Sequence, residues 1–240
     1  MLACVPASVR AQTMSTPMAD ADTRLNANVS SAMGGSLMEM PHMRMTRLEP
    51  RAPGDSARGA AIIGALQRSL APYTDYHRAL ADGFRIFAPK VKQPVYHFTS
   101  WRRSLLSRFR FDPAEPSTLL YERTGDSTFR LVGAMYIAPR HANLHELNER
   151  VPLSLAQWHR HTNWCIPRTR DASRWTAGGP DGRPLFGAQG SITTEAACTA
   201  AGGRFFPEVL GWMVHVYPFA ADTAAVWGRG PDAGRHGHEM

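Results

Sequence analysis

The nine residues Gln157–Cys165, Q-W-H-R-H-T-N-W-C, carry the strongest chemical signal in the chain. In a β-strand successive side chains alternate between faces, so His159 and His161 point the same way, about 6.5–7 Å apart along the strand. Asn163 falls on the same face. In a helix, residues two apart do not face each other, and the pair would be broken up. A same-face His-x-His pair can offer two imidazoles to one metal ion, so we predict a strand that carries a metal site.

The chain has 240 residues, a length that suits one domain or two small ones and is long enough for a sizeable core. Its formal charge is +7, but the basic residues are almost all arginines and are scattered rather than gathered on one element. A nucleic-acid-binding protein more often gathers its charge on one face, so we expect no nucleic-acid partner. No run approaches the roughly 18–20 apolar residues of a membrane-spanning helix, so we expect no membrane span.

The first residues look like the end of a secretory signal. Val9-Arg10-Ala11 has small residues at the −3 and −1 positions of a cleavage point after Ala11, while the positive region and most of the apolar core are missing. We interpret residues 1–11 as the remnant of a signal whose true start lies upstream. The protein is then expected to be periplasmic or secreted. A disordered cytoplasmic N-terminus is the alternative.

The cysteines fit an exported protein. Cleavage of the signal would remove Cys4 and leave Cys165 and Cys198, an even pair that predicts a disulfide in an oxidising compartment. The competing role for Cys165 is a free thiol in the metal site, because alternation along the strand places it on the face of His159 and His161.

Residues 12–46 are expected to form a flexible, Met-rich N-terminal segment. Its end, M-E-M-P-H-M-R-M at 38–45, places two M-x-M pairs around a Pro-His step. Thioethers are soft ligands that favour Cu(I), so Met40, His42 and Met43 are candidate ligands of an auxiliary copper site. The alternative is that the methionines pack on the domain as adaptable hydrophobic residues. The arginine between the last two methionines would repel a cation, which counts against the site.

Residues 47–228 predict a single globular α+β domain with a mainly antiparallel sheet and several short helices, followed by a disordered tail at 229–240. The patterns predict helices near 55–70, 74–80, 101–109, 143–150 and 193–201, and strands near 84–87, 94–99, 154–165 and 210–219. A hairpin is expected over 117–138 around a Gly-Asp turn, with Glu122 facing Arg130 across it.

Two further histidines complete the predicted site. On the last expected strand, L-G-W-M-V-H-V-Y-P-F at 210–219, Met213, His215 and Tyr217 share one face. A thioether beside an imidazole suits copper. His97 sits between two aromatic residues and is either a hydrogen-bonded core histidine or a further metal ligand.

The blocks Y-H-F-T at 96–99, W-H-R-H-T-N-W-C at 158–165 and G-W-M-V-H-V-Y-P-F at 211–219 together resemble a group of uncharacterised exported bacterial proteins. The likeness runs from about residue 38 to about residue 227. The resemblance implies that these blocks belong together, and it implies no activity, because none is established for that group. A His-x-His pair is also found in cupins, but the glutamate after the pair and the P-x-G-x-x-H block are both missing here.

These residues support three hypotheses. The first is an extracytoplasmic transition-metal binding or delivery protein, with copper favoured over zinc. Its ligands would be His159, His161 and His215, with His97 as the fourth and residues 38–45 as an auxiliary soft site. The second is a metal-dependent enzyme that uses the same histidines and one open position, with Glu122, Tyr96 or Tyr217 as the candidate general base or redox partner. The third is a secreted interaction domain without metal. The chain has no G-x-S-x-G, H-E-x-x-H or phosphate-binding glycine loop, so catalytic residues and any protein partner stay unknown.

Overall fold

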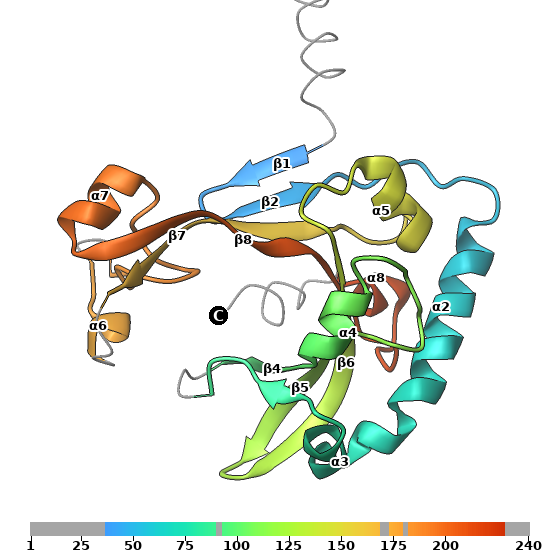
Figure 1. Ribbon diagram of the computed structural model, residues 1–240. Helices are drawn as coiled ribbons and strands as arrows, with labels where there is room; N and C mark the ends of the chain where they lie inside the picture. The colour runs from blue at the N-terminus through green and yellow to red at the C-terminus, as the bar shows by residue number, and fades with distance from the viewer. Residues whose placement is uncertain (1–36, 90–92, 169–172, 180–181, 229–240) are drawn as a thin grey trace, which may run out of the picture. The chain divides into compact units, whose positions relative to one another are not determined.

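The structure is a computed structural model that describes residues 37–89, 93–168, 173–179 and 182–228. Within these ranges eight strands form one antiparallel sheet in the order β1-β2-β7-β8-β6-β5-β4-β3 (Figure 1). The strands are β1 (Leu37–Met40), β2 (Met43–Thr46), β3 (Arg85–Ile86), β4 (Val95–Thr99), β5 (Thr118–Gly125), β6 (Thr128–Ala138), β7 (His159–Pro167) and β8 (Gly203–Val216).

Helices lie in the connections between the strands. They are α2 (Asp55–Leu70), the 3-10 helix η1 (Ala71–Thr74), α3 (Tyr76–Ala81), α4 (Trp101–Leu106), α5 (Leu144–Arg150), α6 (Ser173–Thr176), α7 (Glu195–Ala200) and α8 (Thr223–Val226). The predicted capping box begins α5, where the Asn143 side chain and the Glu146 side chain each accept a backbone N–H of the other residue. Across the described part of the chain, no helix combines the length and the apolar character needed to cross a membrane.

The predicted α+β class with an antiparallel sheet is confirmed. The expected long helix is α2, and the expected hairpin is formed by β5 and β6, with Glu122 paired with Arg130 across it. The last strand is longer than predicted, because β8 begins at Gly203 and its first half pairs with β7. Pro207 lies within that half, and a proline in a run argues against a strand when only the local sequence is considered.

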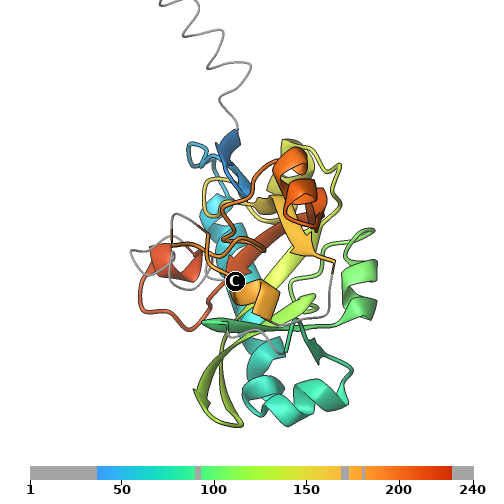
Figure 2. The same cartoon turned by 90° about the vertical axis from the view of Figure 1, so that its left-hand side faces the viewer.

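Residues 37–46 belong to the sheet, although the sequence predicts a flexible segment over 12–46. They form the β1–β2 hairpin, whose second strand pairs with β7. The pairing partner lies far along the chain, so no local pattern reveals it. In both views the hairpin lies at one end of the sheet and β4 and β5 lie at the other (Figure 1, Figure 2). The predicted signal remnant, residues 12–36 and the tail at 229–240 lie outside the described residues.

The two faces of the sheet differ in character. One face carries the main hydrophobic core, in which Phe98, Trp158 and Trp212 belong to the same cluster as Leu66 of α2. Because side chains alternate along each strand, the neighbouring positions point to the other face. That second face carries a smaller cluster, which includes Met135 and Met213, and it also carries the histidines of the predicted site.

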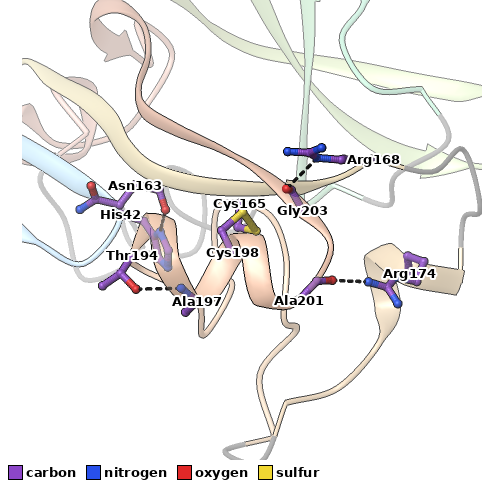
Figure 3. Close-up of a disulfide and its surroundings, with 10 residues drawn as sticks. All are labelled: His42, Asn163, Cys165, Arg168, Arg174, Thr194, Ala197, Cys198, Ala201 and Gly203. Atoms are coloured by element: carbon purple, nitrogen blue, oxygen red, sulfur yellow. Dashed lines mark hydrogen bonds between the residues drawn. A yellow bond between two sulfur atoms is a disulfide. The ribbon is translucent and has the colours of Figure 1, made fainter.

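A disulfide joins Cys165 of β7 to Cys198 of α7 (Figure 3). Phe186 and Ile192 are buried around it in a small cluster of their own. The packing leaves no room for a side chain at Gly203, where an added Cβ would lie 2.4 Å from the Cys165 sulfur and 2.7 Å from the Cys198 sulfur. The predicted disulfide is present. Because Cys165 is bonded to Cys198, it is not a free thiol, and its competing role in the metal site is excluded.

Candidate metal centre

Four buried histidines from three strands form one row of neighbouring rings. His97 comes from β4, His159 and His161 from β7, and His215 from β8. The ring centroids of His97 and His215 are 5.5 Å apart, those of His215 and His159 are 5.0 Å apart, and those of His159 and His161 are 5.7 Å apart. The strand β7 begins at His159, later than the predicted start near residue 154, and it presents the predicted His-x-His pair. The fold adds the other two histidines to this pair.

The bend of the sheet brings His97 to the other histidines. In the sheet order, β4 and β8 are separated by β5 and β6, so three strand spacings of about 4.8 Å would place them about 14 Å apart in a flat sheet. The rings of His97 and His215 are nevertheless only 5.5 Å apart. Figure 1 shows the reason, because β7 and β8 lie above β4 and β5 across the curved sheet. The face that carries the histidines is the concave one.

The spacing of neighbouring rings suits two imidazoles that share one ion. A metal–nitrogen distance of about 2.0–2.1 Å and tetrahedral angles would place neighbouring ring centroids roughly 5 Å apart. The three measured separations run from 5.0 to 5.7 Å. As the rings stand, however, no group of three His, Cys, Asp or Glu side chains in the described ranges is arranged to hold a metal ion. Binding therefore requires at least one ring to turn its nitrogen toward the others.

His97 has the environment of a neutral imidazole. It is buried, and burial lowers its pKa to about 4, an effect that the nearby Val95 carbonyl only partly opposes. Among the described residues, neither ring nitrogen of His97 has a hydrogen-bond partner that meets the usual geometric limits. A neutral imidazole nitrogen is the form that binds a metal ion.

A cavity of about 490 Å³ lies against the row of histidines. His97, His161 and His215 line it from the strands. Its other walls include the exposed side chains of Trp101 and Leu210, which are 65% and 50% exposed. A cavity of this size can hold a small molecule and gives an ion access to the rings.

A β-bulge in β8 sets the position of Met213 relative to His159. His159 pairs with Met213 on β8, and His161 pairs with Val209. A step of two residues along β7 therefore corresponds to a step of four residues along β8, which is the bulge. Leu210 within the bulge has φ 64°, a left-handed conformation that is rare for a leucine. An added Cβ on Gly211 would lie 2.2 Å from the Ala138 carbonyl oxygen, so glycine is required there. Bulges re-aim side chains, and this one places Met213 directly opposite His159.

The other predicted ligands divide into two groups. Met213 pairs with His159 and Met43 pairs with His161, while Met40 lies opposite Met43 on β1. His42 is placed differently: its ring nitrogens face the backbone carbonyls of Asn163 and Gly190, and it belongs to the surroundings of the disulfide (Figure 3). The predicted alternation of side chains, which placed Asn163 on the face of the histidines, also fails, because its φ of 55° interrupts the extended backbone. The side-chain amide of Asn163 instead donates a hydrogen bond to the Pro41 carbonyl.

Two more methionines lie beside the histidines, and only the first of them, Met45, belongs to the predicted auxiliary site at 38–45. Met45 pairs with His159 from β2, and Met135 pairs with His215 from β6. The M-x-M spacing with Met43 is a local signal for Met45, because residues two apart share a face of a strand. No local signal points to Met135, since its nearness to His215 depends on the order of the strands.

None of the candidate general bases is both near the histidines and able to accept a proton at neutral pH. Glu122 is paired with Arg130 on the hairpin, and Tyr96 belongs to the main core. The Tyr217 ring lies 6.3 Å from His215, but burial raises its pKa above the usual range, so the phenol stays protonated at neutral pH.

No protein-family profile, curated protein or solved structure matches this chain. The resemblance to exported bacterial proteins therefore stays a prediction, and the chemistry of the site has to be inferred from its own residues.

Proposed function

We propose that this protein binds a transition-metal ion, with copper favoured over zinc, through the imidazoles of His97, His159, His161 and His215. The single observation that carries the proposal is the row of four buried histidine rings with neighbouring centroids 5.0 to 5.7 Å apart. Imidazole is a ligand for zinc, copper, iron and nickel, and it binds in its neutral form.

The surroundings of the rings favour copper. Thioethers stand directly opposite three of the histidines across the sheet, with Met43 beside His161, Met213 beside His159 and Met135 beside His215. Thioether sulfur is a soft ligand that prefers Cu(I) and has little affinity for hard cations. The cavity supports the proposal too, because it lets an ion reach rings that are otherwise buried.

The proposed setting is the periplasm or the exterior of the cell. The support is the Cys165–Cys198 disulfide, because such bonds persist in oxidising compartments and are rare in a reducing cytoplasm. A metal-binding protein in that setting would handle ions on their way into or out of the cell.

The test is elemental analysis of protein exported to a periplasm and purified without a chelator or a His-tag. We expect about one copper ion per chain, as a single cluster of imidazoles implies. The double variant His159→Ala/His161→Ala should lose affinity by more than about 100-fold, the upper end of what the loss of a supporting group costs.

The matched control is His77→Ala/His145→Ala, which removes two exposed histidines that pair with Asp75 and Glu149. This control should bind metal like the unmodified protein. Thermal unfolding of each variant separates loss of metal from loss of fold. Metal-free protein that also takes up neither copper nor zinc when the ions are added would refute the proposal and leave an interaction domain as the better hypothesis.

A further inference from the structure

The four methionines of the β1–β2 hairpin share one face with the His-x-His pair. Residues directly opposite each other in an antiparallel sheet point to the same side. The pairing therefore defines two rows that cross the sheet: Met38, Met45, His159 and Met213 form one, and Met40, Met43 and His161 form the other. The hairpin thus continues the histidine face with sulfur ligands as far as the edge of the sheet.

The methionines of β2 lie especially near the histidines. Thr162 donates its N–H to the His42 carbonyl, and Thr46 donates its N–H to the Trp158 carbonyl. Hydrogen-bonded and non-hydrogen-bonded pairs alternate along an antiparallel ladder, so the pairs at 43/161 and 45/159 fall at non-hydrogen-bonded positions. Side chains lie closer together at such positions, with Cα atoms about 4.5 Å apart.

Burial increases along the row from the edge strand inward. Met40 is 40% exposed, Met43 is 8% exposed and His161 is 4% exposed. Among the described residues, Met43 is buried and yet belongs to none of the three hydrophobic clusters. Packing in one of these hydrophobic clusters therefore does not account for the burial of Met43.

Arg44 does not face the proposed ligands. It lies between Met43 and Met45 in sequence, so alternation turns it to the opposite face of the sheet. There it pairs with Glu39 and comes within 3.9 Å of Glu208. The positive charge that counts against a cation site in the sequence is therefore neutralised on the other side of the strand.

We propose that the β1–β2 hairpin is a Cu(I) subsite, in which the thioethers of Met43 and Met45 bind the ion together with the imidazoles of His159 and His161. Met38 and Met40 extend the same sulfur face to the edge of the sheet. This inference rests on the proposed function and adds the oxidation state, because thioethers select Cu(I) and contribute little to the binding of Zn(II).

The experiment measures the affinity of the full chain for Cu(I) under anaerobic conditions, in competition with a chromophoric Cu(I) chelator, and its affinity for Zn(II) separately. The double variant Met43→Leu/Met45→Leu keeps the side-chain volume, so the fold should survive. We expect its Cu(I) affinity to fall by about tenfold or more, as the loss of a soft ligand implies. Its Zn(II) affinity should stay within about twofold of the unmodified protein, because the imidazoles remain.

The matched control is Glu39→Gln/Arg44→Gln, which changes the opposite face of the same hairpin and should leave Cu(I) binding unchanged. X-ray absorption of the Cu(I)-loaded protein provides a second measurement and should show sulfur as well as nitrogen around copper. An absorption spectrum that shows only nitrogen ligands around copper would refute the methionine subsite. A methionine variant that keeps its Cu(I) affinity and still binds Zn(II) would refute it too. Either result would leave the proposed histidine site unaffected. Failure of the unmodified protein to bind either ion would remove both proposals.

Discussion

Single residues in this protein owe their ionisation state to their immediate surroundings. His97 is kept neutral by burial, which lowers its pKa to about 4, and the neutral ring is the form that the proposed metal binding requires. Asp55 shows the opposite case, because its charged form is the stabilised one. Its carboxylate accepts hydrogen bonds from the Ser154 hydroxyl at 2.6 Å and from the Ala52 N–H at 2.9 Å.

Asp55 should make stability depend on pH in the acid range. The hydrogen bond from Ser154, followed by that from Ala52, lowers the pKa of this carboxyl below its usual value. A group whose pKa is lower in the folded protein stabilises it at pH values above the unfolded pKa, which is about 4, and loses this effect as pH falls through the folded value. Asp55→Asn should therefore lower the melting temperature at pH 7, and the difference from the unmodified protein should shrink below about pH 4.

The comparison is made by thermal unfolding between pH 3 and pH 7. Asp126→Asn is the control, because it makes the same chemical change on the exposed β5–β6 turn and should have little effect at any pH. A difference for Asp55→Asn that stays constant over this range would show that the stabilisation does not come from the charge.

At the scale of the element, the bulge of β8 is the feature that most directly shapes the site. It takes up two extra residues opposite the His-x-His pair and so brings Met213 into register with His159. The close approach of Gly211 to the Ala138 carbonyl holds this geometry between β8 and β6. A change in the bulge should therefore weaken the proposed metal binding.

Gly211→Ala tests this coupling. The added methyl group would lie 2.2 Å from a backbone oxygen, which cannot move aside without shifting a strand. We expect a loss of about 1–3 kcal/mol of stability, the usual cost of overpacking, together with weaker metal binding. Chemical denaturation and metal titration measure the two effects.

Gly64→Ala is the control for the same chemical change. The nearest atom to its added Cβ is 3.4 Å away, at the end of the flexible Arg68 side chain within α2. Alanine favours a helix over glycine by about 0.5–1 kcal/mol, so this variant should be stabilised and should bind metal normally. Normal metal binding by Gly211→Ala would argue that the bulge does not position the ligands.

At the scale of the whole molecule, the structural disulfide and the histidine row belong to different parts of the described chain. Cys165 and Cys198 belong to a small cluster with Phe186 and Ile192, whereas Met135 and Met213 belong to the cluster beside the histidines. Both parts share β7, but their side chains pack separately. Stability and metal binding should therefore respond differently when the disulfide is removed.

The variant Cys165→Ser/Cys198→Ser should lose about 3–4 kcal/mol of stability, the chain-entropy cost of opening a loop of this length, since the cysteines are 33 residues apart. Its metal content should match that of the unmodified protein, because neither sulfur is a ligand. Denaturant unfolding and elemental analysis test the two statements. A loss of metal in a variant that remains folded would mean that the disulfide region helps to build the site.

The sequence by itself was sufficient for the features that depend on neighbouring residues. The helix α2, the capping box of α5, the β5–β6 hairpin and the strand that carries His159 and His161 all follow from local spacing and were predicted. The reason is that caps, turns and alternation are set by interactions within a few residues. The same logic finds the M-x-M pairs, although it cannot tell that they belong to the sheet.

The assembly of the site was decided only by the tertiary structure. His97 reaches His215 because the sheet bends across three strand spacings, and Met135 reaches it because β6 is the neighbour of β8. Arg44 leaves the ligand face because β2 is a paired strand rather than a flexible segment. Strand order and sheet curvature result from packing between residues far apart in the chain, and a local pattern carries no information about them.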